Sequence, residues 1–148
     1  MMLMGIPICI FANGNMPQKV ATAFSSKYPD ASVHKWTVQK GDYLVKFRYD
    51  NRLYRASFDV NGSWEQTERK INLTRNLPAP VRKGFMNSGY QACNIDGIKE
   101  IITPSGHFFE VWVDDGNYYD DNHHDNFMQD YLLRFSADGN MMGAEVLP

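Results

Sequence analysis

The chain has 148 residues and an aromatic content of 14%, which is typical of a packed globular domain and argues against disorder. A chain of this length can bury about two-thirds of the surface that its unfolded form exposes, so one domain is expected. The formal net charge is −2 at pH 7, whereas a general nucleic-acid-binding protein is expected to carry a net positive charge.

The charge is divided unevenly along the chain. Residues 1–83 hold 13 Lys and Arg against 6 Asp and Glu, whereas residues 84–148 hold 2 against 11. Opposite charges of this kind either attract the two halves to each other or keep both surfaces solvated.

The first twelve residues carry no charged side chain and are mostly apolar, and a polar Asn-Gly-Asn segment follows. This run is too short to span a bilayer and is typical of a signal-peptide core. It lacks the usual basic start, so a buried strand is the alternative. We predict that residues 1–15 are a leader and that the mature protein is exported. Cleavage would then remove Cys9 and leave Cys93 without a disulfide partner.

Two parts of the chain repeat one pattern of apolar residues and turns. The matching positions are Met16-Pro17, Val20 and Phe24 with Leu77-Pro78, Val81 and Phe85; Tyr43, Val45 and Phe47 with Phe109, Val111 and Val113; and Phe58 before Asn61-Gly62 with Phe135 before Asp138-Gly139. Such self-similarity indicates duplication. We predict a single domain, 16–148, of two repeats, 16–66 and 77–148, joined by a linker at 67–76.

Each repeat begins with a predicted helix. Val20, Phe24 and Tyr28 recur at intervals of four, which places them on one helical face. The second repeat has Val81 and Phe85 at the same spacing. Both helices are therefore expected to turn this face to the core.

Strands are predicted to follow each helix. Residues 43–49 alternate aromatic or apolar with mixed side chains at period two, which indicates one buried face. Asn61-Gly62 is a strong hairpin signal. Because each helix would cover one face of its own strands, we predict an α+β fold with one continuous antiparallel sheet, both helices on one face and the other face open.

Four segments together match a known pattern. They are the helix end Phe24-x-x-x-Tyr28-Pro29, Trp36 ahead of Tyr43-x-Val45-x-Phe47, the stretch Phe58-Asp59-Val60-Asn61-Gly62-Ser63-Trp64, and the linker leading into Leu77-Pro78-x-x-Val81. With these segments the chain resembles, over most of residues 16–148, the PepSY-like family described as putative β-lactamase-inhibitor-like proteins of Gram-negative envelopes.

The resemblance implies a tandem helix-plus-sheet architecture, an exported location, and a role in binding or inhibiting another protein, with no catalytic residues to carry over. The chain departs from the family in two places. Its leader lacks a basic start, and its second repeat carries an acidic insertion at residues 114–130 that could alter or block the sheet face.

Trp112 is the leading candidate for a partner contact. It aligns with Lys46 of the first repeat, on the opposite face from Val111 and Val113, which predicts an exposed aromatic on the open face. Exposed aromatics among polar groups are typical of binding hot spots. The alternative is that the insertion folds over Trp112 and buries it. The neighbours of Trp112 on that face are expected to include Leu44, Lys46, Arg48, Arg55 and Arg134. The candidate partner-binding residues are Trp112, Glu110, Lys46, Arg48, Arg55 and Arg134.

The acidic insertion, 114–130, is the cluster with the clearest ligand chemistry. Its carboxylates would suit Ca²⁺, and His123 and His124 could bind a transition metal. The spacing does not match an EF-hand loop. We therefore expect a solvated loop with no metal, and keep an ion or small-molecule sensor as the alternative function.

Catalysis is not expected. Cys93, His107 and Asp96 form the conceivable trio, but none lies in a recognisable nucleophile motif. The basic residues of 46–55, interleaved with tyrosines, could bind single-stranded nucleic acid. Solvated strand positions explain the same charges, and an exported protein rarely needs that activity.

The sequence thus predicts an exported, periplasmic, non-catalytic module that needs no cofactor and has no membrane span. Its expected partner is a protein or peptide of the cell envelope, docked on the open sheet face by occlusion, as an inhibitor would dock. A structural oligomerisation module is a further alternative.

Overall fold

The computed structural model describes residues 16–116 and 128–148; the predicted leader at residues 1–15 and the middle of the acidic insertion lie outside the described residues. The elements in chain order are α1 (Gln18–Lys27), β1 (Ser32–Gln39), β2 (Asp42–Tyr49), β3 (Arg52–Phe58), β4 (Trp64–Lys70), η1 (Thr74–Asn76), α2 (Ala79–Met86), β5 (Asn94–Thr103), β6 (Gly106–Asp114), β7 (Asp130–Ser136) and β8 (Met141–Val146).

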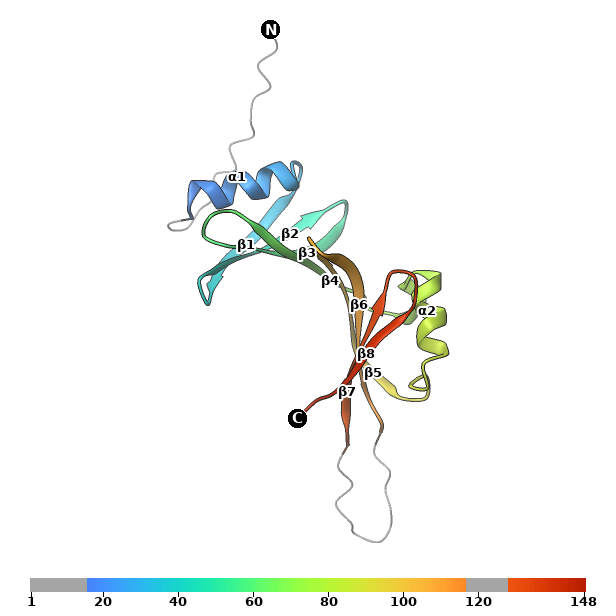
Figure 1. The fold of residues 1–148 in the computed structure, drawn as a ribbon. Coiled ribbons are helices and arrows are strands. Elements are labelled where there is room, and N and C mark those ends of the chain that lie inside the picture. Colours follow the sequence, from blue (N-terminus) through green and yellow to red (C-terminus); the bar gives the residue numbers. More distant parts are fainter. Residues whose placement is uncertain (1–15, 117–127) are drawn as a thin grey trace.

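The strands form one eight-stranded sheet in which each strand lies beside its neighbours in the chain, from β1 to β8. Every neighbouring pair is antiparallel. The β2–β3 hairpin turns at Asp50 and Asn51, whose φ angles of 49° and 60° match the left-handed conformation of a type I′ turn. The predicted α+β class and continuous antiparallel sheet are confirmed (Figure 1).

Helix α1 covers the first four strands with the residues that recur at helical spacing. Val20 and Phe24 are fully buried. The Phe24 ring meets the rings of Trp36 and Phe47 edge-on, with centroids 5.4 Å and 5.0 Å away. Edge-to-face packing of this kind adds stability beyond the area buried. Alternate residues of β2 complete this first core, as the period-two pattern predicts.

Helix α2 covers the last four strands in the same way. Val81 and Phe85 are buried against Val111, Leu133 and Phe135 from the middle of the second half of the sheet. The apolar positions that the two halves share in the sequence therefore face a core in both halves.

A hairpin turn packs against the helix backbone in each half. Gly62 has a φ angle of 84° and Gly139 one of 87°. A Cβ atom on Gly62 would lie 2.6 Å from the carbonyl oxygen of Lys19, and one on Gly139 would lie 2.0 Å from that of Pro80. Glycine is required at both positions, by conformation and by space.

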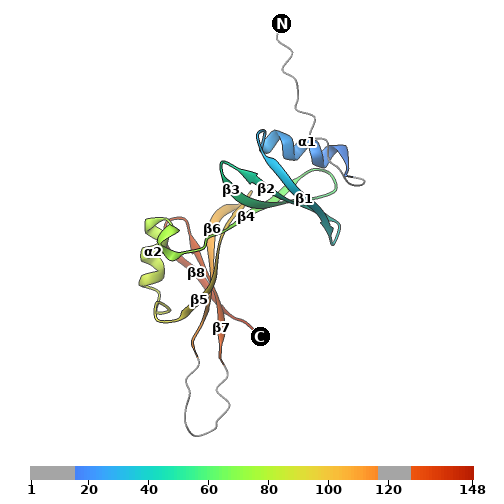
Figure 2. The same cartoon turned by 180° about the vertical axis from the view of Figure 1, so that it is seen from behind.

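Both helices lie on the same side of the sheet (Figures 1 and 2). Thr67, which lies under α1, is directly opposite Ile102 of β5, and Ile98 of the same face of β5 lies under α2. Opposed residues of antiparallel strands point to one face, so the helix side runs through both halves. The sheet bends between the halves with α1 and α2 on its outer side, so neither of them lies on the concave side.

Strand β4 joins the two halves. It pairs with β3 through residues 64–68 and with β5 through residues 67–70. The first four residues of the predicted linker, 67–76, therefore lie in the sheet. The β3–β4 ladder ends at Arg55 and Glu68, and beyond this pair the two strands diverge.

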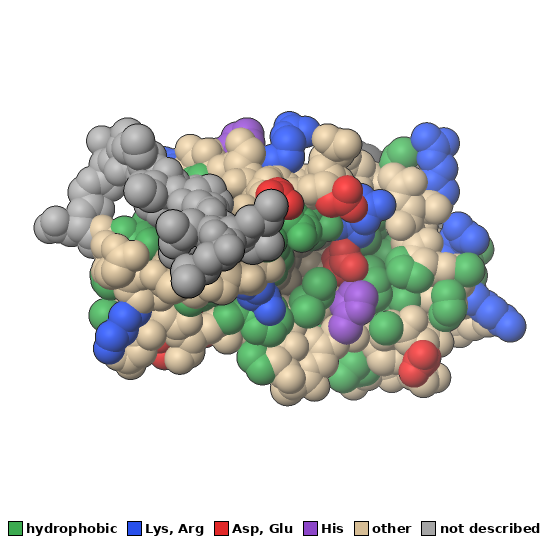
Figure 3. All heavy atoms as spheres, turned by 90° about the horizontal axis from the view of Figure 1, so that it is seen from above, with side chains coloured by type: hydrophobic (Ala, Val, Ile, Leu, Met, Phe, Trp, Pro, Cys, Tyr) green, Lys and Arg blue, Asp and Glu red, His purple; other side chains and the backbone are tan. Residues whose placement is uncertain are grey.

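The two cores are separated on the helix side by a polar contact. Glu100 of β5 accepts a hydrogen bond from Arg69 Nε at 2.7 Å and interacts with His107 Nε2 at 3.0 Å. Viewed from above, charged and histidine side chains lie among hydrophobic ones in the middle of the molecule (Figure 3). Each helix thus packs on a core of its own.

Candidate partner-binding face

Trp112 lies on the concave face of the sheet, half-buried. Its neighbours in β6, Val111 and Val113, are fully buried on the helix side, which fixes the direction of the Trp112 side chain. Gly97 is directly opposite on β5 and leaves room for the indole above it. Lys99 Nζ lies 5.1 Å from the ring centroid, within range of a cation–π interaction. The side chain lies on the face opposite Val111 and Val113, as the alternation predicts, but it is half-buried and not exposed as predicted. The alternative, cover by the insertion, involves residues outside the described ones.

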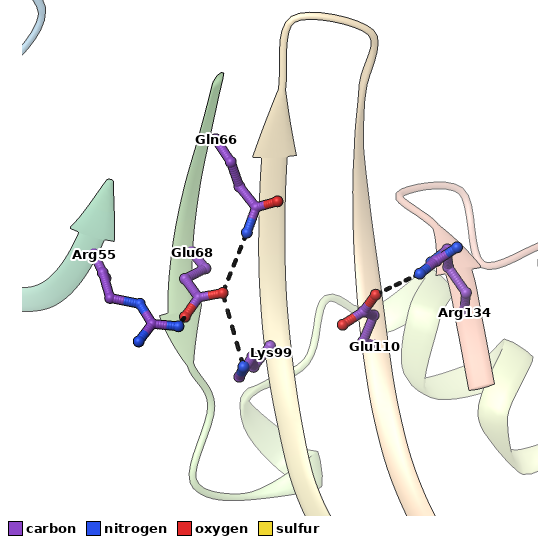
Figure 4. A network of polar contacts seen from close by, with 6 residues as sticks. All are labelled: Arg55, Gln66, Glu68, Lys99, Glu110 and Arg134. Atoms are coloured by element: carbon purple, nitrogen blue, oxygen red, sulfur yellow. Dashed lines mark hydrogen bonds and ion pairs between the residues drawn. The ribbon is translucent and has the colours of Figure 1, made fainter. Parts of the chain in front are cut away.

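A polar network crosses the concave face in the middle of the sheet. The Glu68 carboxylate of β4 forms an ion pair with Arg55 of β3, accepts a hydrogen bond from Gln66 Nε2 at 3.2 Å, and lies 3.7 Å from Lys99 Nζ of β5 (Figure 4). Glu68, which falls in the predicted linker, therefore connects Arg55 of the first half to Lys99 of the second half electrostatically.

Glu110 and Arg134 form a second pair on the same face. Arg134 Nη2 donates to Glu110 Oε1 at 2.6 Å, and the guanidinium lies 5.1 Å from the Phe108 ring (Figure 4). Glu110 is only 8% exposed. Its carboxylate is therefore satisfied within the chain, and Arg134 is the member of the pair that a partner could reach.

The basic residues of the first half do not adjoin Trp112. Lys46 and Arg48 lie on β2, exposed on the concave face, and no ion pair involves either of them among the described residues. Strands β3, β4 and β5 separate them from β6. At about 4.8 Å between strands, β2 and β6 are roughly 19 Å apart across the sheet. The residue of β6 in register with Lys46 is Phe108, so Trp112 is displaced further along the strand. The expectation that these residues are neighbours of Trp112 is therefore wrong. Lys46 and Arg48, together with Leu44, lie on β2 and share the concave face with Trp112 but do not contact it.

Two adjoining hollows occupy the concave face between these groups. One, of about 600 Å³, lies between β3 and β4 where the strands diverge. The other, of about 430 Å³, extends from the β4 end to Trp112. Lys70, Asn72 and Lys99 line both hollows. The predicted site thus divides into a basic part and an aromatic part with Lys99 between them.

Sequence reasoning missed Lys99 and Lys70. One signal was available for Lys99, because residues 84–148 hold only 2 Lys and Arg against 11 acidic residues. An isolated lysine in an acidic half is a candidate for a specific contact. Lys70 falls in the predicted linker, 67–76, so the sequence gives no indication that it is paired with Lys99 of β5.

The conceivable catalytic trio is not brought together. Cys93 directly precedes β5 and lies near Asp114, whereas His107 is opposite Ile102 at the other end of that strand. Cys93 and Ile102 are nine positions apart in extended chain, which places Cys93 and His107 roughly 30 Å apart. Burial raises the pKa of the Cys93 thiol, and the nearby Asp115 raises it further, so the nucleophilic thiolate is disfavoured.

No group of His, Cys, Asp and Glu within residues 16–116 and 128–148 has an arrangement that could hold a metal ion. The predicted sensor residues His123 and His124 lie outside the described residues. At the described ends of the insertion, Asp114 accepts hydrogen bonds from Asn94 Nδ2 at 2.9 Å and from the Gly116 amide at 2.8 Å. These contacts hold the end of β6 against β5 and fix the start of the insertion.

The comparisons with known proteins show the family and the fold. The model of the family described as "Putative beta-lactamase-inhibitor-like, PepSY-like" matches residues 10–57 and 41–142, which together span most of the chain. The chain belongs to this family. The resemblance predicted from the sequence is thereby confirmed.

Solved structures of similar fold come from Bacteroides. A BLIP-like protein from Bacteroides fragilis is 27% identical, with a TM-score of 0.77 over 90% of this chain and 89% of that one. A DUF2874 family protein from Bacteroides ovatus is 20% identical, with a TM-score of 0.75 over 90% and 89%. A protein from Bacteroides eggerthii described as putative periplasmic is 19% identical, with a TM-score of 0.69 over 90% of each chain. At 20% and 19% identity, the similarity to the Bacteroides ovatus and Bacteroides eggerthii proteins establishes the fold alone.

No curated protein matches the chain. In the described part of the chain, neither helix has the length and apolar character needed to cross a membrane.

Proposed function

We propose that this chain is a non-catalytic binding module of the cell envelope that docks a protein or peptide partner on its concave sheet face. The observation that carries the proposal is the one-sided covering of the sheet. Both helices pack on the outer side, while the concave side presents Trp112 over a glycine, with Lys99 beside its ring. A half-buried aromatic held by its neighbours is already ordered before binding, so little conformational entropy is lost when a partner covers it.

The ion pairs of this face support the same function. Glu110 is paired with Arg134, and Glu68 is paired with both Arg55 and Lys99. A partner that covers these carboxylates does not leave them unpaired in a dry interface, which would be costly. Exposed cations at the rim then contribute to orientation and association rate.

The family and the relatives support the location and the mode of action. The family is described as inhibitor-like, and one relative is described as putative periplasmic. We propose export for this chain and inhibition by occlusion, in which the concave face covers a site on another protein. This mode needs shape and charge complementarity but no catalytic group.

We also infer that the chain arose by duplication and that residues 16–148 act as one domain. The support is the equivalent packing of the halves. In each half a turn glycine contacts the helix at corresponding residues, Lys19 for Gly62 and Pro80 for Gly139, which lie directly before the matching valines. A bend between two similar halves generates the concave face without a dedicated binding loop.

The test is capture from an envelope extract with wild type, Trp112→Ala and Met86→Ala proteins. Met86 is a matched control because it is an exposed apolar side chain, 56% accessible, on the helix side. We expect wild type and Met86→Ala to retain the same partner. Trp112→Ala should weaken binding by about 2 kcal/mol, or roughly 30-fold, if Trp112 is an anchor.

The melting temperatures of the three proteins must agree within a few degrees, which excludes unfolding of a variant as the cause of weaker capture. Equal capture by wild type and Trp112→Ala would remove Trp112 from the binding surface. Loss of capture by Met86→Ala alone would place the partner on the helix side and contradict the proposal.

A further inference from the structure

The hollow between β3 and β4 has an unusual concentration of positive charge. Its charged lining comprises Lys46, Arg55, Lys70 and Lys99 on the concave face, with Glu68 as the single acid. Arg52 and Arg69, whose side chains alternate toward the helix side, border the same gap between the strands. It forms because the β3–β4 ladder ends at Arg55 and Glu68, so that the strands separate beyond this point.

The internal acids do not neutralise this charge. Glu68 is shared between Arg55 and Lys99, and Arg69 is paired with Glu100 at 2.5 Å. Within the described residues, no ion pair involves Lys46, Arg52 or Lys70. The hollow therefore carries a surplus of positive charge, in a chain whose net charge is −2.

Like charges are placed directly opposite each other on both walls of the hollow. Lys46 of β2 is opposite Arg55 of β3, and Lys70 of β4 is opposite Lys99 of β5. Directly opposed like charges in a sheet are destabilising. A local arrangement that opposes folding is typical of a functional site, where an incoming group of opposite charge relieves the repulsion.

The shape and surroundings of the hollow favour a polypeptide over a nucleic acid. Leu53, 42% exposed on the concave face, supplies an apolar wall beside the cations. A long polyanion would continue toward Trp112, where Asp96 and Asp130 line the adjoining surface and would repel it. A short segment with two or three carboxylates and an apolar side chain fits both the charge and the apolar wall.

We propose that this hollow receives an acidic segment of the protein partner, whose carboxylates lie between the Lys46–Arg55 wall and the Lys70–Lys99 wall. The inference rests on the proposed function, because it assumes that the partner docks on the concave face. Lys99 then links the two contact areas, since it lies between the acidic segment and the Trp112 ring.

The experiment is fluorescence anisotropy of the full chain with a labelled peptide of alternating Glu and Leu, beside a Gln-and-Leu peptide and a single-stranded dT oligonucleotide. The test variant is Lys46→Gln with Lys70→Gln. The control variant is Lys19→Gln with Lys83→Gln, which removes two exposed positive charges from the helix side. Thermal melts confirm that each variant is folded.

Wild type should bind the Glu peptide, with an affinity that falls as salt increases. The Lys46→Gln/Lys70→Gln variant should bind it at least tenfold more weakly, and the control variant as wild type does. Equal weakening in both variants would mean a general charge effect and overturn the site. Equal binding of the Gln peptide, tighter binding of the oligonucleotide, or absence of binding would also overturn it.

The two proposals fail separately. If the envelope partner depends on Trp112 but the Glu peptide binds both lysine variants alike, the concave face stands as the docking surface and the acidic segment is wrong. If the peptide result is as expected but Trp112→Ala captures the partner normally, the hollow stands and the aromatic anchor is wrong.

Discussion

The two halves of the molecule are alike on the helix side of the sheet and unlike on its concave side. On the helix side the halves match closely: Val20 and Phe24 in one half correspond to Val81 and Phe85 in the other, and all four are buried. On the concave side the halves differ. The first half carries unpaired cations, while the second carries an aromatic beside ion-paired acids.

The contrast between the matched helix side and the unlike concave side reflects two different requirements, packing of a core on one side and contact with the proposed partner on the other. Packing requires apolar side chains at fixed positions, because a cavity or a steric clash in a close-packed core is costly. The concave side is free of this requirement, and its side chains differ between the halves. Substitutions on the two sides should therefore have different kinds of effect.

The largest effect is expected where the helix side is most constrained, at Gly139. A Gly139→Ala substitution combines an unfavourable φ of 87° with a Cβ 2.0 Å from the Pro80 carbonyl oxygen, and should cost about 3 kcal/mol or more. Gly62→Ala should cost less, since its contact with Lys19 is 2.6 Å. Urea denaturation measures the free energy of unfolding of each variant.

Gly41→Ala is the matched control for these substitutions. Gly41 has a φ of 88°, but a Cβ atom at this position would have no heavy atom within 4 Å, so only the backbone cost of about 1 kcal/mol should remain. An equal loss in all three variants would mean that the backbone angle, and not contact with the helices, requires glycine at Gly62 and Gly139.

A second prediction concerns a polar group in the first core that the second core lacks. Thr67 is 2% exposed, and its Oγ1 lies 2.5 Å from Tyr28 Oη and accepts from Trp64 Nε1 at 2.9 Å. Thr67→Val keeps the shape but leaves both partners without this oxygen, which should cost about 2 kcal/mol. Thermal and urea unfolding measure it. Thr37→Val, on an exposed strand position, should change stability by less than about 0.5 kcal/mol.

The helix side was predictable from the sequence because packing leaves a periodic signal. The period of four in α1 and the period of two in β2 identify Phe24, Val45 and Phe47 as core residues, and the structure buries all three. Strand β4 leaves no such signal. Its sequence after Trp64 is entirely polar, because side chains such as Glu68 and Arg69 form ion pairs on the two faces at the joint. Part of it was therefore predicted as linker.

The sequence predicts which face of the sheet carries the candidate site, but not which of its residues lie close together. Alternation along β6 shows that Trp112 points away from Val111, but it contains no information about distance across the sheet. That distance depends on strand order, which places three strands between Trp112 and Lys46. For the same reason the hollow between β3 and β4 could not be predicted, because it depends on where a ladder ends.

A third prediction compares the two arginine–glutamate ion pairs of the concave face, Arg134–Glu110 and Arg55–Glu68. Arg134→Met leaves Glu110, 8% exposed, without its 2.6 Å partner, and should cost about 1 kcal/mol. Arg55→Met leaves Glu68 with Lys99, so its cost should stay below about 0.5 kcal/mol. Urea unfolding at low and at high salt measures both. Equal costs would mean that Lys99 does not compensate at Glu68 and that the network of Figure 4 is not shared between the halves.

The smallest effect is expected at the acidic end of the second half. Partial burial raises the pKa of Asp96, and the carboxylates of Asp114 and Asp130 raise it further. Because the pKa is higher in the folded state than in the unfolded state, the ionised carboxylate disfavours folding above the folded pKa. This cost disappears as the pH falls below the unfolded value. Asp96→Asn should therefore raise stability at pH 7 by about a few tenths of a kcal/mol, since the side chain is exposed.

The check is the difference in melting temperature between Asp96→Asn and wild type, followed from pH 7 to pH 3. The difference should be positive at pH 7 and shrink toward zero in acid, where wild-type Asp96 is protonated in both states. Asp138→Asn, in the turn beside α2, provides a control for general removal of negative charge. A gain of the same size in that variant would assign the effect to net charge, and a loss of stability at Asp96 would mean that its carboxylate holds the strand ends together instead of repelling its neighbours.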